Sequence, residues 1–152
     1  MRRRHLLSAV AAGALACALP VRAAKALPRV DVYKSPSCGC CTAWVEHLKA
    51  AGFPVNVVEV DDTTAMRRRH GLPERFGSCH TGIVGGYVVE GHVPAAEVKR
   101  LLVLKPRAIG IAVPGMPPGS PGMEVGGRQD PYDVFLIDTH GRETVFAHYP
   151  KS

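Results

Sequence analysis

The chain has few aromatic residues and lacks the signatures of several common enzyme classes. Aromatic side chains make up 6% of its 152 residues, and it contains one tryptophan. It has no glycine-rich loop of the phosphate-binding kind, and no serine, histidine and aspartate in a context that suggests a catalytic triad. No carboxylate pair is placed for acid–base catalysis, and no internal repeat is visible. Nucleotide hydrolysis and triad-type hydrolysis are therefore not indicated.

An apolar run long enough to cross a membrane is also missing. The uncharged run Leu6 to Ala16 is about half of the ~20 residues that a transmembrane helix needs. It follows three arginines, Arg2 to Arg4, and is followed by the small-residue end Val21-Arg22-Ala23. This order predicts a secretory signal peptide over residues 1–23 and a mature exported domain over residues 24–152, with no membrane span.

The leader leaves the route of export open. Arg3-Arg4 fits a loose twin-arginine pattern. Cys17 follows Ala14-Leu15-Ala16, which is a poor lipoprotein box because a larger aliphatic residue is expected at Ala14. We expect the mature protein to begin near Ala24, with lipidation of Cys17 as the alternative.

The excess of basic residues lies mostly in this leader. Four of the 19 lysines and arginines, and none of the 13 acidic residues, lie within residues 1–23, so the mature domain carries a net charge of +2. Such a balance does not predict a nucleic-acid partner. The remaining basic cluster, Arg67-Arg68-Arg69, falls in a predicted helix, where we expect the three side chains to be solvated.

Hydrophobic periodicity predicts an α/β domain. The expected elements are a strand at 30–33, a helix at 42–51, a strand at 55–60, a helix ending near 70, strands at 79–84 and 87–90 around Gly85-Gly86, and a helix between Pro94 and Pro106. The second strand is mostly apolar, as expected for a strand covered on both faces. The order βαβαββα, with a cysteine motif between the first strand and helix, predicts a thioredoxin-like fold.

The C-terminal part departs from that order. Residues 113–127 hold four prolines, five glycines and two methionines, which predicts a long loop without regular structure. Strands at 133–137 and 144–148, separated by a turn, predict a closing β-hairpin. Because the loop has no apolar periodicity with which to pack, we expect a bound metal ion to order it.

Four cysteines remain in the mature domain: Cys38, Cys40, Cys41 and Cys79. Export favours a disulfide framework, but the adjacent Cys40 and Cys41 cannot both join distant segments because neighbouring side chains diverge. Cys38 and Cys41 have the C-x-x-C spacing of a thiol exchange site, in which the helix N-terminus lowers the pKa of the first thiol. A thiol–disulfide oxidoreductase, with Cys38 attacking and Cys41 resolving, is one hypothesis.

A third and a fourth sulfur favour a metal site instead. Cys40 would offer competing disulfides to an exchange enzyme, whereas three sulfurs at one helix start suit a soft metal ion. In thioredoxin-like folds the loop before the third strand lies against the cysteine motif and usually carries a cis-proline, but here it holds Cys79 and His80. His80 is therefore a candidate ligand. The other histidines of the mature chain are scattered, and most are expected at the surface: His47, His70, His92, His140 and His148.

The loop methionines point to copper. Thioether sulfur is a ligand for Cu(I) and hardly at all for zinc. Met116 and Met123 lie in a loop flexible enough to fold over the cysteines, although they could also be two surface residues. A structural zinc site is a third hypothesis, which the methionines would not serve.

Three stretches of the chain resemble a known family. "VYKSPSCGCCTAWVEHLKAAGF", "GLPERFGSCHTGIVGGYVVEGHVPA" and "IAVPGMPPGSPGMEVGG" are similar, in order, to the signature stretches of an exported bacterial family. That family was long filed as a domain of unknown function, and its members are described as CopG-type copper-resistance or metal-binding proteins. The resemblance covers nearly the whole mature chain.

The resemblance implies a periplasmic, thioredoxin-like domain that holds one or several copper ions, chiefly as Cu(I). Its cysteines fall on Cys38, Cys40, Cys41 and Cys79, and its methionine-rich loop on Met116 and Met123. Storage, delivery to a copper efflux or carrier protein, and Cu(I)/Cu(II) interconversion are alternative roles for such a site.

Overall fold

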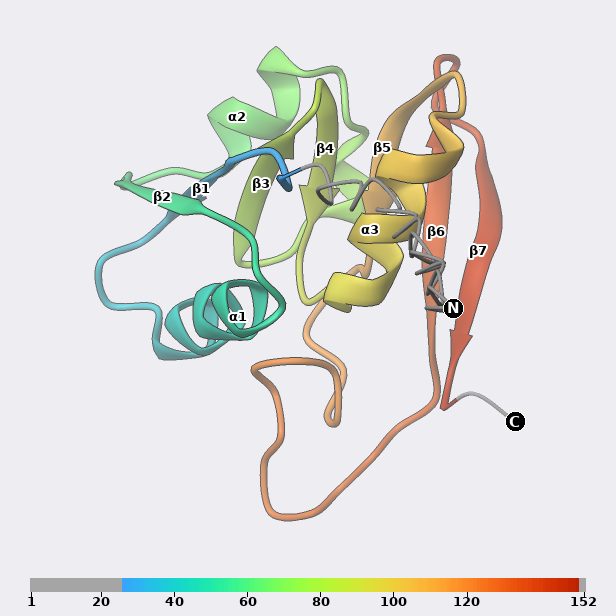
Figure 1. The fold of residues 1–152 in the computed structure, drawn as a ribbon. Helices are drawn as coiled ribbons and strands as arrows, with labels where there is room; N and C mark the ends of the chain where they lie inside the picture. The colour runs from blue at the N-terminus through green and yellow to red at the C-terminus, as the bar shows by residue number, and fades with distance from the viewer. Residues whose placement is uncertain (1–25, 151–152) are drawn as a thin grey trace, which may run out of the picture.

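A seven-stranded mixed sheet is the framework of the residues that the structure describes (Figure 1). The structure is a computed structural model that describes residues 26–150, so the predicted signal peptide and the cleavage site near Ala24 lie outside the described residues. The elements are β1 (Val30–Lys34), α1 (Gly39–Ala50), β2 (Val55–Glu59), α2 (Thr64–Arg69), the short 3-10 helix η1 (Glu74–Phe76), β3 (His80–Val84), β4 (Tyr87–Glu90), α3 (Ala95–Leu104), β5 (Ala108–Ala112), β6 (Tyr132–Asp138) and β7 (Glu143–Tyr149).

The strands are arranged across the sheet in the order β2-β1-β3-β4-β5-β6-β7. β1 pairs with β2 in parallel and with β3 antiparallel, while β4 pairs with β5 in parallel. The predicted succession of strands and helices is present from β1 to α3, and the predicted closing hairpin is present as β6 and β7. β5 has no counterpart in the sequence prediction, since its five residues, AIGIA, show no alternation of polar and apolar side chains.

Helical segments cover both faces of the sheet. On one face, Trp44 of α1 and Leu101 of α3 pack in one apolar cluster with Val89 of β4. On the other face, Phe76 of η1 packs with Val88 of β4. The alternation of Val88 and Val89 between two clusters is the two-residue period of a strand buried on both sides. The described residues contain no helix that is both long and apolar enough to span a bilayer.

One prediction about the sheet is wrong. β2 was expected to be covered on both faces, yet Val57 in its centre is 41% exposed. The reason is its place in the sheet, because among the described strands β2 lies at the edge and pairs only with β1. An apolar sequence therefore did not distinguish a buried central strand from an exposed edge strand.

A histidine links the two helices of the first face. The backbone N–H of Ala95, at the start of α3, donates a hydrogen bond to Nε2 of His47 on α1 over 2.9 Å. Partial burial lowers the pKa of His47 below its usual value of 6.5, while the charge of Glu124 opposes that shift. The hydrogen bond requires a lone pair on Nε2, so the neutral ring is the form that joins the helices.

Acid is expected to weaken this link. Because the pKa of His47 is lower in the folded state, its stabilising contribution is complete above the unfolded value of 6.5 and is lost as the pH falls below it. We expect the free energy of unfolding to fall less in His47→Gln than in the wild type between about pH 7.5 and about pH 5, as measured in urea. Buried His80 and His92 titrate in both proteins, so their contributions to the pH dependence of stability cancel in this comparison. An identical fall in the free energy of unfolding of both proteins would contradict the conclusion that the neutral His47 ring joins the two helices.

Candidate metal centre

Three cysteines lie where β1 passes into α1. Cys38 is the N-cap residue of α1, and Cys40 and Cys41 belong to its first turn, which contains no acidic residue. The turn before the helix is closed by a hydrogen bond from the Cys38 N–H to the Ser35 carbonyl. The free N–H groups of a helix start favour negative charge nearby. This position therefore favours thiolates.

The structure brings all four predicted cysteines together. Cys40 Sγ lies 3.5 Å from Cys38 Sγ and 3.8 Å from Cys79 Sγ, and the four sulfurs lie within 4.8 Å of one another. Cys38 and Cys41 are joined in a disulfide, and Cys40 and Cys79 are free. The oxidised form thus contains the C-x-x-C pair that dithiol exchange would use, next to two further thiols.

Two buried imidazoles lie beside the thiol of Cys79. Its Sγ is 3.4 Å from Nδ1 of His80 and 3.2 Å from Nε2 of His92. The other ring nitrogens lie 3.0 Å from the Gly91 carbonyl oxygen for His80 and 2.9 Å from the Pro121 carbonyl oxygen for His92. Since a carbonyl only accepts hydrogen bonds, those nitrogens carry the ring protons. Nδ1 of His80 and Nε2 of His92 are therefore left as the lone-pair atoms, and a metal-binding histidine is usually oriented in this way.

Burial sets the charge state of these groups. It lowers the pKa of His80 to about 3, with a further contribution from His92. It also lowers the pKa of His92 itself. Burial and the nearby Cys40 raise the pKa of the Cys79 thiol to about 12. Neutral imidazoles are ready ligands, and a cation bound at Cys79 would favour its thiolate.

His92 is a site residue that the sequence prediction missed. It was placed among the surface histidines, but its side chain is fully buried. The β3–β4 hairpin explains its position, because Thr81 is paired with Glu90 in the antiparallel register. Continuing that register by two residues places His92 opposite Cys79. The predicted hairpin could have identified His92 as a neighbour of Cys79, because the turn at Gly85-Gly86 fixes which residues face each other.

Trp44 supports the imidazoles from α1. Its ring lies 4.3 Å from the ring of His80, and its Nε1–H donates to the Val93 carbonyl over 2.8 Å. A Cβ on Gly82 of β3 would lie 3.3 Å from the Trp44 ring, so a glycine at this point allows the indole to lie close to the sheet. The only tryptophan of the chain therefore positions one of the candidate ligands.

The methionine loop borders the site. In Figure 1 the loop that follows β5 (orange) passes beneath α1. A Cβ on Gly122 would lie 2.8 Å from the Cys40 carbonyl oxygen, so the loop backbone touches the first turn of α1. Pro121 is buried, and its carbonyl accepts a hydrogen bond from Nδ1 of His92. Close packing at Gly122 and backbone hydrogen bonds therefore also hold this loop, and its ordering by a bound metal ion stays a prediction. Met116 is half exposed, and Met123 is partly buried.

A buried ion pair lies next to the Cys79 segment. Nη1 of Arg67 is 3.0 Å from Oε1 of Glu90, and the Glu90 side chain is fully buried. Burial raises the pKa of Glu90, while the hydrogen bond from Thr81 opposes that shift most strongly. The prediction that the basic cluster is solvated is therefore wrong for Arg67 and holds for Arg68 and Arg69, which are exposed.

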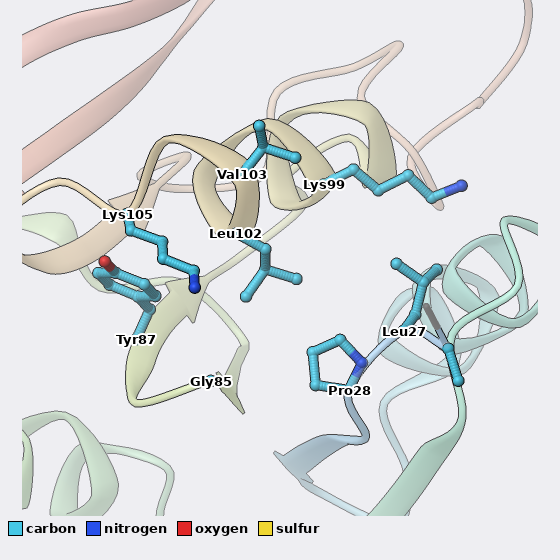
Figure 2. A pocket seen from close by; sticks show the side chains of 9 residues that line it. Leu27, Pro28, Gly85, Tyr87, Lys99, Leu102, Val103 and Lys105 are labelled. Atoms are coloured by element: carbon cyan, nitrogen blue, oxygen red, sulfur yellow. The ribbon is translucent and has the colours of Figure 1, made fainter. Parts of the chain in front are cut away.

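A separate cavity of about 730 Å³ lies away from the sulfurs, between the first described residues and α3. Figure 2 shows Leu27 and Pro28 on one side of it and Tyr87 and Leu102 on the other. Its described lining is apolar apart from two lysines, and includes no cysteine, histidine or acidic residue. This cavity is not part of the cluster of cysteines and histidines.

The fold and the site together define a mixed α/β protein with a cluster of sulfur and imidazole donors at a helix start. Two solved structures are similar to it, "Copper resistance protein copG" in Form 2 and in Form 1. They are 47% and 46% identical, each with a TM-score of 0.77, and the match covers 82% of this chain and 99% of each of theirs. The chain belongs to the family of copper resistance protein CopG, as the resemblance in its sequence implies.

A second comparison agrees. Residues 76–123 match a family described as a protein of unknown function, DUF411, and this segment contains Cys79, both site histidines and both loop methionines. No curated protein matched the chain.

Proposed function

We propose that this protein binds copper in the periplasm as part of copper resistance, and that it holds the metal as Cu(I). One observation supports this function above the others, namely four sulfurs within 4.8 Å of one another at the start of α1. Thiolates are soft ligands that suit Cu(I). The names of the two similar structures agree with this chemistry.

The proposed ligands are the thiolates of Cys38, Cys40, Cys41 and Cys79 in the reduced chain. Cys40 lies within 4 Å of both Cys38 and Cys79, a position from which one sulfur can bridge two ions. One or several copper ions therefore fit this donor set. His92 and His80 present unprotonated nitrogens beside Cys79, and Met116 and Met123 are the proposed thioether donors from the bordering loop.

The architecture supports a thioredoxin-like ancestry for the site. β1, α1 and the parallel β2 place the cysteine motif at a helix start, and β3 begins next to Cys79. In this proposal Cys79 occupies the place at which an exchange enzyme guides its substrate thiol. Export follows from the predicted leader, and a copper efflux or carrier protein is the proposed recipient of the metal.

Metal preference tests the proposal. We expect the reduced protein to bind Cu(I) several orders of magnitude more tightly than Zn(II), because thiolate and thioether donors match the softer ion. Anaerobic competition of the reduced protein against a Cu(I) chelator, and separately against a zinc chelator, gives the two affinities. If zinc displaces copper at equal free concentrations, the copper proposal fails and a structural zinc site replaces it.

A second function is favoured by one specific observation, the disulfide between Cys38 and Cys41. It is the bond that a thiol–disulfide oxidoreductase would form and break. Cys40 and the Cys79–histidine contacts count against this function, because they add competing thiols and ligands to an exchange site. Replacement of Cys40 separates the two functions, as described below.

A further inference from the structure

We propose that the buried Arg67–Glu90 ion pair is a positioning device for the metal site. It fixes the backbone of Ser78, and through Ser78 it sets the position of Cys79 relative to the start of the methionine loop. The inference deepens the copper-binding function proposed above and rests on it for its role in metal binding.

Every polar group of Ser78 has a partner in this arrangement. Its N–H donates to Oε1 of Glu90 over 2.7 Å, and its carbonyl accepts from Nη1 of Arg67 over 3.3 Å. Its hydroxyl donates to the carbonyl of Gly115. The two charged partners are themselves joined over 3.0 Å. Ser78 is therefore held on both sides of its backbone by one ion pair.

Glu90 also holds the chain beyond Cys79. Its second oxygen, Oε2, accepts from the Thr81 hydroxyl over 2.6 Å. One carboxylate therefore binds the residue before Cys79 and a residue of the strand that follows it. Arg67 is fixed in turn by the hydroxyls of Thr63 and Thr64 at 3.2 and 2.9 Å. Both members of the ion pair are anchored. Residues 78–81, which the pair contacts, therefore have little conformational freedom.

The loop that carries Met116 is attached to the same point. The N–H of Gly115 donates to the Gly77 carbonyl over 3.2 Å, and its carbonyl accepts from Ser78. Met116 is the next residue along the chain. Cys79 therefore directly follows Ser78, and Met116 directly follows Gly115, which is hydrogen-bonded to Ser78.

Two glycines lie close to this contact. A Cβ on Gly91, whose φ is +72°, would come within 2.8 Å of the Ser78 hydroxyl oxygen. A Cβ on Gly77 would lie 3.2 Å from Nε of Arg67. A side chain at Gly91 is thus excluded, whereas one at Gly77 would require its neighbours to shift by a few tenths of an ångström.

Stability alone does not explain a buried ion pair, because well-packed apolar side chains of similar volume often give the folded state equal or greater stability. Its partners here are backbone groups next to a candidate ligand. Neutralising Glu90 would leave the buried Arg67 with only the half-exposed carboxylate of Glu74, 3.6 Å from its Nε, as a counter-charge, and would weaken the bond to the Ser78 N–H. The expected result is a Cys79 thiol that is less well fixed against Cys40.

The test compares Glu90→Gln with a matched control, Glu97→Gln. Glu97 is also a fully buried glutamate close to an arginine, but it lies on α3 and accepts from the Tyr149 hydroxyl. Two quantities are measured on reduced protein below the unfolding transition of each variant. They are the alkylation rate of Cys79 in the metal-free protein, followed by peptide mass spectrometry, and the affinity for Cu(I).

We expect Glu90→Gln to raise the alkylation rate and to lower the Cu(I) affinity by about tenfold or more, as for losses of groups that orient ligands. Glu97→Gln should change neither quantity beyond its effect on stability. If both variants lose stability equally while both quantities stay at the wild-type value, the pair is only structural and the proposal is wrong. The alkylation measurement needs no copper, so it can succeed or fail independently of the proposed function.

A milder variant covers the case in which Glu90→Gln does not fold. Ser78→Ala removes the hydrogen bond to Gly115 and the longer 3.9 Å contact of the hydroxyl with Cys79 Sγ, and it leaves the ion pair intact. We expect faster amide exchange at Gly115 and Met116 and a Cu(I) affinity that is lower than that of the wild type. Unchanged exchange at both amides would overturn the link between the ion pair and the loop.

Discussion

Replacing Cys40 with serine is expected to lower the affinity of the reduced protein for Cu(I) by about a hundredfold or more. Cys40 Sγ is near both Cys38 and Cys79, so its loss removes the sulfur that can bridge the helix start and Cys79. A serine hydroxyl is a hard donor of similar size and does not replace thiolate at a soft ion. Chelator competition, together with the number of copper ions bound per chain, measures the effect.

The same variant tests the oxidoreductase hypothesis. Cys40→Ser keeps Cys38 and Cys41, so dithiol exchange would persist, whereas Cys38→Ser would abolish it. Normal copper binding by Cys40→Ser, combined with a disulfide reductase activity that disappears in Cys38→Ser, would make thiol–disulfide exchange the better assignment. Loss of copper by Cys40→Ser with no reductase activity in the wild type supports the metal site.

Replacing Trp44 with alanine is expected to lower the free energy of unfolding by roughly 3–5 kcal/mol. The side chain is fully buried, donates to the Val93 carbonyl and packs beside Gly82 of the sheet. Its removal leaves a large cavity between α1 and β3 and takes away the ring that lies against His80. Urea unfolding of reduced, metal-free protein gives the change directly.

Trp44→Phe is the matched control for that experiment. Phenylalanine keeps an aromatic ring but has no N–H, so the Val93 carbonyl loses its partner at a cost of about 1–3 kcal/mol. A smaller loss in Trp44→Phe than in Trp44→Ala is therefore expected. Equal losses would show that the hydrogen bond, rather than the packing of the ring, provides the stability.

Local patterns in the sequence were sufficient for the parts of the site that depend on neighbours along the chain. The strand–helix junction at residues 34–39 followed from β-prone residues, a proline break and a helical stripe containing Trp44. The approach of Cys79 to the motif followed from the expected order of strands, and the structure places its sulfur 3.8 Å from that of Cys40. Both depend on periodicity and topology, which sequence does encode.

Features that depend on pairings between distant residues were missed. His92 is a ligand candidate only through its position opposite Cys79 in the hairpin, and a scattered histidine gives no sign of that by itself. Arg67 is buried because Glu90 lies on a strand beside it, and this partner is 23 residues away in the sequence. The exposure of β2 depends on which strand has no second neighbour. In each case the deciding contact is between elements rather than within one.

The disulfide between Cys38 and Cys41 encloses Cys40 within a ring of four residues and leaves both Cys40 and Cys79 as thiols. The oxidised chain therefore still offers two thiols and two neutral imidazoles. Uptake of two electrons and two protons would convert it to a chain that offers four thiols and the same imidazoles. The site therefore contains two thiols in the oxidised chain and four in the reduced chain. The ambient balance of reductant and oxidant determines which form is present. Copper capacity in such a protein would report the redox state of its surroundings.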